Sequence, residues 1–389
     1  MDALLPPDEA HPPGNGALPP ARRELTPEDE AHLARAVELG RRGWGKVHPN
    51  PLVGCVLVRD GEVVGEGWHE EYGEAHAEAN ALARAGKRAR GATVYVSLEP
   101  CNHHGHTPPC SLALLEAGVA RVVYGGADPG SVSGGGGRVL REAGVEVVGP
   151  VFTPREVRRE NPAFFHVQEH ATPFVALKLA QSLDGGIAEG PGLRTRITGP
   201  EAGFETHRLR SGFDAVMVGS GTALVDDPLL TVRASVPLRT QPVRVVLDRR
   251  CRLEPEAMLF RDVPDAPLLV LVGEEADEDR AGALRKAGAR VRVVAGGPGG
   301  LSLEGVLETC WEEGIRSVFC EGGGTLAARL MAEGKARRLY LLVAPFVLGT
   351  EAVPAFPGLQ GREVWDAWEP TVSPRLLGRD VLLTFDRRK

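Results

Sequence analysis

Three residues with zinc-ligand chemistry occur in order along the first part of the sequence. His76 begins the run His76-Ala77-Glu78, Cys101 follows a predicted strand, and Cys110 opens the next predicted helix. One imidazole and two thiolates leave a fourth tetrahedral position for water, which is typical of a catalytic zinc site. Water bound there has a pKa of about 7 instead of about 16, so it can provide a hydroxide near neutral pH.

A carboxylate stands beside these ligands. Glu78 is two residues from His76, and residues two apart on a helix do not share a face, so we expect Glu78 to border the metal without binding it. In hydrolytic deamination a carboxylate takes a proton from water and delivers protons to the ring nitrogen and to the departing ammonia. Buried cysteines often only pack, but the ordered set His-x-Glu, Pro-Cys and Cys is typical of zinc deaminases. We therefore predict Glu78 as the catalytic residue.

Two neighbouring segments could complete the site. Asn50, within His48-Pro-Asn-Pro51, has an amide that can donate to and accept from a ring edge, although the flanking prolines are equally typical of a simple turn. His103, His104 and His106 could add a metal ligand, contact the substrate or lie in solvent, and these alternatives stay open.

The elements that must position these residues follow from the hydrophobic pattern. A helix should begin at Thr26 with a capping hydroxyl and early acids, and alternating strands and helices then predict a parallel sheet covered by helices. A second α/β series begins at Pro173. The predicted domains are a loose proline-rich tail at 1–24, a deaminase domain at 25–150, a linker at 151–172 and a second domain at 173–389.

The totals limit the class of protein. The chain has 389 residues, 42% hydrophobic and 25% charged, which is typical of a soluble two-domain protein without an apolar run that could span a membrane. The net charge of −7 argues against a nucleic-acid partner and favours a small-molecule substrate. Six cysteines and a start that resembles no secretory signal lead us to expect thiols in the cytoplasm.

The motifs together resemble a known family. His48–Pro51, Val53-Gly-Cys55, His76-Ala-Glu78 and Leu98–Cys110 closely resemble the bifunctional deaminase/reductase family of riboflavin biosynthesis. Eight residues separate the two cysteines, as in this family, whereas cytidine and tRNA adenosine deaminases have two. Motifs in the second half extend the resemblance: Lys178–Gly185, His207–Arg210, Val218–Thr222, Asp226–Arg233, Gln241–Asp248 and Glu321–Gly324.

The resemblance implies an α/β protein with an N-terminal cytidine-deaminase-like three-layer domain and a C-terminal dihydrofolate-reductase-like domain. The first would bind Zn²⁺ and deaminate 2,5-diamino-6-ribosylamino-4(3H)-pyrimidinone 5′-phosphate, a small phosphorylated pyrimidine. The second would use NADPH to reduce the ribosyl group to ribityl. Members of this family commonly form multimers, so the resemblance also allows a homo-oligomer.

The resemblance also assigns residues of the second domain. The implied cofactor-binding residues are Ala180, Arg196, Thr222, Asp226, Gly323, Gly324 and Thr325. The implied substrate-binding residues, with Asn50 of the first domain, are Arg194, Arg210, Leu230, Arg233 and Glu321. The glycine-rich entry to a helix after Glu321 suits a dinucleotide phosphate, and a guanidinium suits a sugar phosphate.

One departure from the family pattern leaves a second interpretation open. Arg194-Thr-Arg196 stands where the family usually has Ser-x-Trp, so a substrate hydroxyl and an aromatic next to the cofactor are lost. Two arginines could instead bind phosphate, or the reductase half could be degenerate and inactive. An RNA-editing deaminase would require a basic face and a short cysteine gap, and a structural zinc scaffold would require a fourth protein ligand.

Overall fold

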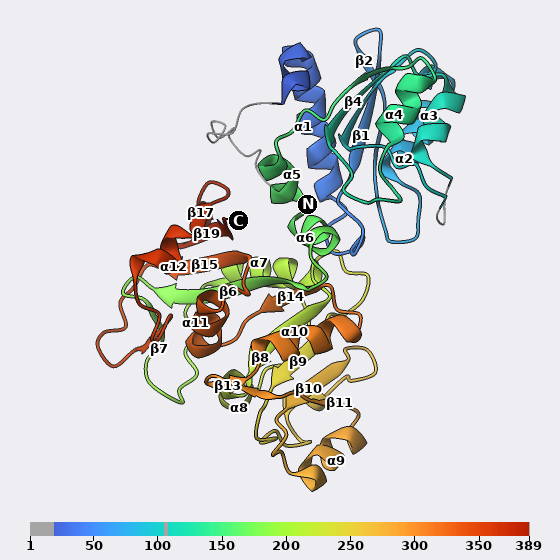
Figure 1. Ribbon diagram of the computed structural model, residues 1–389. Coiled ribbons are helices and arrows are strands. Elements are labelled where there is room, and N and C mark those ends of the chain that lie inside the picture. The colour runs from blue at the N-terminus through green and yellow to red at the C-terminus, as the bar shows by residue number, and fades with distance from the viewer. Residues whose placement is uncertain (1–18, 105–107, 389) are drawn as a thin grey trace. The chain divides into compact units, whose positions relative to one another are not determined.

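The computed structural model describes residues 19–104 and 108–388, which form two compact units, residues 19–171 and 172–388 (Figure 1). Most of the predicted tail, residues 1–18, lies outside the described residues, as does His106. Residues 20–24, which we expected in the tail, form the short 3₁₀ helix η1, in which Arg22 donates to Glu156 over 2.7 Å. Secondary structure therefore begins before the predicted helix start at Thr26.

The first unit is built on a five-stranded sheet with the order β2-β1-β3-β4-β5. Its elements are η1 Pro20–Glu24, α1 Pro27–Arg41, β1 Gly54–Arg59, β2 Glu62–Trp68, α2 Ala77–Ala85, η2 Gly86–Ala89, β3 Thr93–Leu98, α3 Cys110–Ala117, β4 Arg121–Gly126, α4 Gly136–Glu142, β5 Glu146–Val148, α5 Pro154–Glu160 and α6 Pro162–Glu169. The sheet is mixed: β3, β4 and β5 are parallel, as the alternation of strands and helices predicted, and β1 runs antiparallel to both β2 and β3.

Helices cover both faces of this sheet. Successive residues of β1 point to opposite faces: Leu57 packs with α2, α3 and α4, whereas Val56 packs with Leu33 and Leu39 of α1. Figure 1 shows α1 on one side of the sheet and the other three helices on the opposite side. This is the three-layer arrangement that the motifs predicted, and it explains why β1 is buried on both faces.

The start of α1 is fixed by a capping box. Thr26 and Asp29 exchange side-chain and backbone hydrogen bonds, as the predicted helix start required. Asp29 is buried and also accepts from Tyr95 over 2.7 Å and from Arg121 over 2.7 Å. Burial alone would raise the pKa of Asp29, but these hydrogen bonds outweigh it and lower the pKa to about 2.

The segment 151–172, predicted as a linker, is helical and belongs to the first unit through residue 171. Thr153 forms a second capping box that starts α5, and Phe165 of α6 packs in one cluster with Leu98. Glu160 at the end of α5 accepts two hydrogen bonds from Arg41 of α1, both of 2.9 Å. Apolar packing and this half-buried ion pair are the reasons why the segment folds onto the deaminase unit.

The second unit contains a ten-stranded sheet with the order β11-β10-β9-β8-β14-β6-β15-β19-β17, and β18 pairs with β19. In this order, the seven strands β11, β10, β9, β8, β14, β6 and β15 are parallel, and β19 runs antiparallel to β15. The elements are β6 Phe174–Ser182, β7 Gly186–Ala188, α7 Pro200–Ser211, β8 Ala215–Gly219, α8 Ser220–Asp226, β9 Val243–Leu247, η3 Met258–Phe260, β10 Leu268–Val272, α9 Glu278–Lys286, β11 Arg290–Val293, β12 Gly296–Gly297, β13 Gly300–Leu301, α10 Leu303–Glu312, β14 Ser317–Cys320, α11 Gly324–Ala332, β15 Arg338–Ala344, β16 Val353–Pro354, α12 Arg362–Asp366, β17 Trp368–Pro370, β18 Arg375–Leu377 and β19 Asp380–Arg387.

Candidate metal centre and cofactor cavity

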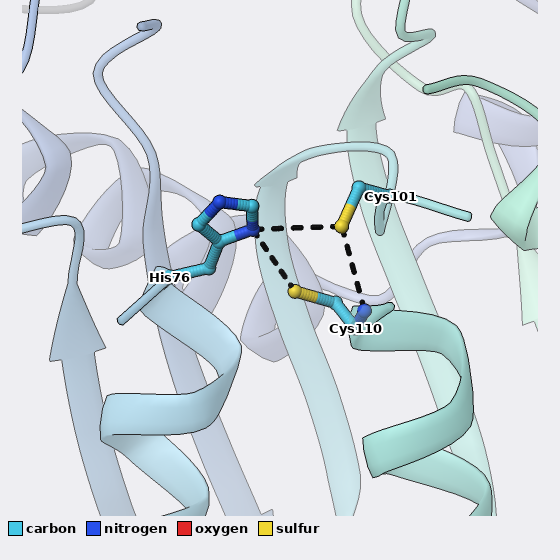
Figure 2. Close-up of side chains that lie close together, drawn as sticks. All are labelled: His76, Cys101 and Cys110. Atoms are coloured by element: carbon cyan, nitrogen blue, oxygen red, sulfur yellow. Dashed lines mark hydrogen bonds between the residues drawn. The ribbon is translucent and has the colours of Figure 1, made fainter. Parts of the chain in front are cut away.

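The three predicted metal ligands meet at the ends of their elements. His76 is the N-cap of α2, Cys101 follows β3, and Cys110 is the first residue of α3. The Nδ1 atom of His76 lies 3.5 Å from the Cys101 sulfur and 3.3 Å from the Cys110 sulfur (Figure 2). The three donor atoms lie within 4.8 Å of one another, so one ion can reach all of them.

Close packing of α2 against the sheet sets the position of His76. A side chain on Gly67 of β2 would place its first carbon 2.4 Å from the backbone oxygen of Ala77, so only glycine allows α2 to begin there. The imidazole makes no side-chain capping bond to its own helix. Its Nδ1 is therefore available to face the two sulfurs.

The electrostatics of the cluster favour a thiolate. The pKa of Cys101 is lowered despite its burial, and the main cause is a hydrogen bond from the Cys110 thiol. The imidazole of His76 and the backbone N–H of Cys110 lower this pKa further. The same partnership raises the pKa of Cys110. An imidazole nitrogen beside one ionised and one ionisable sulfur is the donor set that Zn²⁺ prefers.

The number of ligands distinguishes a catalytic site from a structural one. Over residues 19–104 and 108–388, no fourth histidine, cysteine or carboxylate joins the cluster. A site with three protein ligands can hold water as its fourth. The described histidines of the loop, His103 and His104, are not members of the cluster, and His106 lies outside the described residues.

Glu78 lies next to the cluster in the first turn of α2 without being a member of it. Its side chain is buried, with 3% of the residue exposed. Burial is the main cause that raises the pKa of Glu78 to about 7, and the negative charge of Cys101 acts in the same direction. The carboxyl group can therefore both hold and release a proton near neutral pH.

Asn50 has a buried partner that the sequence motifs did not reveal. Its Nδ2 lies 3.1 Å from Nε2 of His69, and Nδ1 of His69 lies 3.1 Å from the carbonyl oxygen of Ala75. A carbonyl only accepts, so Nδ1 of His69 carries the proton and Nε2 accepts from Asn50. The hydrogen bond to Nε2 of His69 therefore orients the Asn50 amide with its Oδ1 turned away from His69. The His69 ring also lies edge-on to the His76 ring, with 5.4 Å between the ring centroids.

A cavity of about 1290 Å³ in the second unit collects most of the residues predicted there. All seven predicted cofactor residues line it, together with Arg194 and Glu321: Ala180, Arg196, Thr222, Asp226, Gly323, Gly324 and Thr325. Arg210, Leu230 and Arg233 are not among the lining residues. The cavity is large enough for a dinucleotide with a small substrate.

The glycine-rich run after β14 forms one wall of the cavity. A side chain on Gly324 would meet the backbone oxygens of Pro354 and Ala355 at 2.7 Å, which explains the glycine at the first residue of α11. The amide of Gly323 donates to the Thr222 hydroxyl over 3.0 Å, so two of the predicted cofactor segments are tied together. The amino end of α11 then borders the cavity, where it favours an anion.

Positive charge dominates the lining of the cavity. Lys178 and six arginines line it against only two carboxylates, Asp226 and Glu321; the arginines are Arg194, Arg196, Arg249, Arg250, Arg252 and Arg329. Burial raises the pKa of Asp226, and the nearby charge of Arg194 opposes that rise. An excess of guanidinium groups in a protein of net charge −7 suits a ligand with several phosphates.

Beside the cavity, Arg210 forms a largely buried charged cluster with Glu321 and Lys178. Glu321 accepts two hydrogen bonds from Arg210, whose third group donates to the Thr231 carbonyl over 2.9 Å. Lys178 Nζ lies 4.0 Å from Glu321. The bidentate capacity of Arg210 is thus used within the protein. Lys178 belongs to the predicted motif 178–185 but received no role from the sequence, although it lines the same cavity.

Arg233 and His207 extend this cluster. The backbone N–H of Arg233 donates to Nδ1 of His207 over 3.3 Å, and its guanidinium donates to the Thr231 hydroxyl. Burial, reinforced by the charges of Arg210 and Arg233, lowers the pKa of His207 to about 4. His207 is therefore neutral at physiological pH and accepts a hydrogen bond from the loop that carries Leu230 and Arg233.

Comparison with known proteins accounts for both sites. Residues 26–126 match the cytidine and deoxycytidylate deaminase zinc-binding region, and residues 173–377 match the RibD C-terminal domain. The riboflavin biosynthesis protein RibD of Actinobacillus pleuropneumoniae is 36% identical over 94% of this chain and 97% of that protein, and the RibD of Escherichia coli is 38% identical over 86% and 92%. The chain belongs to the RibD family.

Solved structures agree with this membership. RibD of Acinetobacter baumannii has a TM-score of 0.80 at 32% identity and covers 93% of this chain and 99% of its own. The diaminohydroxyphosphoribosylaminopyrimidine deaminase/5-amino-6-(5-phosphoribosylamino)uracil reductase of Thermotoga maritima has a TM-score of 0.77 at 33% identity, covering 92% and 98%. The predicted fold class is confirmed. As a RibD, the chain is a bifunctional deaminase and reductase with zinc and NADPH as cofactors, and this favours an active reductase half over a degenerate one.

Proposed function

We propose that this chain deaminates 2,5-diamino-6-ribosylamino-4(3H)-pyrimidinone 5′-phosphate and then reduces the ribosyl group of the product to ribityl. The observation that supports this most directly is the pairing, in one chain, of a three-ligand cluster beside the buried Glu78 with a large cationic cavity. The similar Thermotoga maritima protein is named for a deaminase and a reductase of the same kind.

In the first unit, His76, Cys101 and Cys110 would hold the zinc ion. When bound, zinc polarises a water molecule and so makes it a better nucleophile at neutral pH. Glu78 accepts a proton from the attacking water and delivers it to the ring nitrogen; it then takes the proton that remains on the added oxygen and delivers it to the amino group, which leaves as ammonia. A carboxyl with a pKa of about 7 is suited to both directions of transfer. Asn50, oriented by His69, presents its free carbonyl oxygen to the ring edge.

In the second unit, the seven predicted cofactor residues, all of which line the cavity, would bind NADPH. NADPH supplies the hydride, so the protein's task is to place the nicotinamide against the sugar carbon. Arg194 and Arg196 would bind phosphate in place of the family's usual serine and tryptophan. The substrate would lie against Leu230, Arg233 and the Arg210–Glu321 pair. Lys178 would add a positive charge near its phosphate or sugar oxygens.

We also propose that the partners of this chain are small molecules and that nucleic acids and membranes are not among them. Within the described residues, no helix combines the length and apolar character needed to cross a bilayer. The net charge of −7 disfavours a phosphate backbone as ligand. A cytoplasmic location and assembly into a homo-oligomer complete the proposal, and size measurement by light scattering tests the assembly.

A coupled assay on the full chain tests the two activities separately. Ammonia release and then NADPH absorbance are followed after adding the diaminopyrimidinone substrate to the wild type, to Glu78→Ala and to the surface control Glu74→Ala. We expect Glu78→Ala to lose both signals and to recover NADPH oxidation when the deaminated intermediate is supplied. Normal ammonia release from Glu78→Ala would refute the role of Glu78, and a wild type that never oxidises NADPH would refute the reductase.

A further inference from the structure

The helical segment 151–171 is assigned to neither of the two matched families. The deaminase region ends at residue 126 and the RibD C-terminal domain begins at residue 173. The segment nevertheless folds onto the first unit, and one of its side chains reaches the loop that carries Asn50. That side chain is Asn161, which stands between α5 and α6.

Asn161 makes a reciprocal pair of hydrogen bonds with the backbone of Leu52. Its Oδ1 accepts from the Leu52 N–H over 2.7 Å, and its Nδ2 donates to the Leu52 carbonyl over 3.1 Å. Asn161 is buried, so these bonds are shielded from water. One amide side chain thus satisfies both backbone groups of Leu52, as a neighbouring strand would do.

The amide is presented from a rigid support. The backbone N–H of Asn161 donates to Val157 of α5, and its carbonyl accepts from Phe165 of α6, so Asn161 is tied to both helices. Val157 and Phe165 pack in one apolar cluster with Leu98 at the end of β3. The adjacent Glu160 is held by two hydrogen bonds from Arg41. Asn161 is therefore fixed relative to the sheet that supports the metal ligands.

The loop on the other side of this contact carries the proposed substrate residue. Asn50 is two residues before Leu52, its N–H donates to the Val47 carbonyl over 2.9 Å, and its side chain donates to His69. Asn161 therefore fixes the backbone after Asn50, while His69 fixes its amide. Without the contact to Asn161, the backbone around Asn50 would be held only by its hydrogen bonds to Val47 and, through Val53, to His69, and the Asn50 side chain would be less firmly placed.

We propose that Asn161 is a positioning residue of the deaminase site, which holds residues 48–53 so that the amide of Asn50 meets the pyrimidine ring. The inference rests on the proposed deaminase function. It makes the segment 151–171 a working part of the deaminase and not a spacer between two enzymes.

Two variants and a matched control test this role in the full chain. Asn161→Ala removes both hydrogen bonds, and Asn161→Asp keeps the acceptor for Leu52 N–H but can no longer donate to its carbonyl. The control, Glu160→Gln, alters the neighbouring anchor to Arg41 without touching the loop. Deaminase kinetics, reductase kinetics with supplied deaminated intermediate, zinc content and hydrogen exchange of a peptide spanning 48–54 are measured for each.

We expect Asn161→Ala to lower deaminase kcat/KM by about tenfold to a hundredfold, since small displacements of a binding group have effects of this size. The loss should fall mainly on KM, because Asn50 contacts the ring in the ground state as well as in the transition state. Asn161→Asp should lie between Ala and wild type. Hydrogen exchange at 48–54 should accelerate, while zinc content and reductase kinetics stay at wild-type values. Glu160→Gln weakens the anchor of the segment but keeps the Asn161–Leu52 bonds, so it should lose much less deaminase activity than Asn161→Ala.

Several results would overturn the proposal. An unchanged deaminase KM in Asn161→Ala, with accelerated exchange at 48–54, would show that fixing the loop does not matter to the substrate. An equal loss in Glu160→Gln would trace the effect to general loosening of the segment. If Asn161→Ala does not fold, Asn161→Asp carries the same comparison. If the wild type releases no ammonia, the proposed function fails, and the exchange data alone then decide whether Asn161 holds the loop.

Discussion

Replacing Glu321 by glutamine should leave two buried cations without their counter-ion. One carboxylate oxygen of Glu321 lies 3.1 Å from Nη2 of Arg210 and 4.0 Å from Nζ of Lys178. The exposed fractions of these side chains are 10% for Glu321, 11% for Arg210 and 16% for Lys178. At an effective dielectric constant of about 20, a charge pair at 4 Å is worth about 4 kcal/mol. Glutamine loses both attractions and regains the desolvation cost of the carboxylate.

The net effect should therefore resemble other buried ion pairs that lose one partner, a loss of about 3–5 kcal/mol in the free energy of unfolding. The penalty should also depend on pH. Burial lowers the pKa of Lys178, and the charge of Glu321 opposes that shift, so the variant lowers this pKa further. Between the lowered folded pKa and the unfolded value of about 10.4, the unfolded chain binds more protons. The stability of Glu321→Gln should thus rise with pH over this range more steeply than that of the wild type.

Urea unfolding of the full chain, followed by hydrogen exchange of peptides from β6 and β14, reports the second unit separately. Glu333→Gln is the matched control, because Glu333 pairs with Arg329 at the surface over 3.2 Å and should contribute only about 0.2–1 kcal/mol. Adding Arg210→Met to Glu321→Gln should recover part of the loss, since the unpaired charge is removed. A loss in Glu321→Gln no larger than in the control, or one that Arg210→Met makes worse, would refute this reasoning.

Four further predictions concern the metal, a buried carboxylate, a buried arginine and the cofactor loop. Strong chelation should abolish ammonia release and leave NADPH oxidation of supplied intermediate intact; activity that survives removal of all zinc would contradict the metal site. The pKa of Asp29 is lowered in the folded protein, so its carboxylate contributes about 2.5 kcal/mol to the free energy of unfolding above pH 4 and loses this contribution as the pH falls toward 2. The difference in unfolding free energy between the wild type and Asp29→Asn should therefore shrink over that range. Arg244 is fully buried and donates to three backbone carbonyls, one of which belongs to Leu229, just before Leu230. Arg244→Lys should therefore lower the free energy of unfolding in urea by at least about 2 kcal/mol and raise the reductase KM values. An unchanged KM would show that Arg244 does not support the reductase site. Arg196→Ala should raise the KM for NADPH through loss of a phosphate contact, and an unchanged KM would end that assignment.

The chemistry of the metal cluster could be predicted from the sequence because few residue types bind zinc and their order is informative. His76, Cys101 and Cys110 each stand at the end of a predicted element, and the structure brings their donor atoms within 4.8 Å. Strand limits follow from the sequence for the same kind of local reason. The hydrophobic pattern predicts strands at 93–98, 243–247, 268–272 and 317–320, and these are the bounds of β3, β9, β10 and β14. The wide gap between the cysteines identified the family without any knowledge of the fold.

The environment of each group was decided by tertiary structure alone. Glu78 gains its raised pKa from burial, and Asn50 gains its orientation from His69, a residue that no motif singled out. The sequence also marked 151–172 as a linker, although Thr153 and Glu156 form a capping box whose residue types are visible in the local pattern.

Local pattern determines which residues can cap a helix, alternate in a strand or bind a metal, because those properties depend on neighbours a few positions away. Contacts such as Asn161 with Leu52, or Arg210 with Glu321, join residues more than a hundred positions apart. Their formation depends on the order of strands in the sheets and on which helices cover each face, and packing of the whole unit sets that order. The sequence alone thus determined the chemistry and the family of this protein, and only the tertiary structure decided which partners orient, bury and charge the reacting groups.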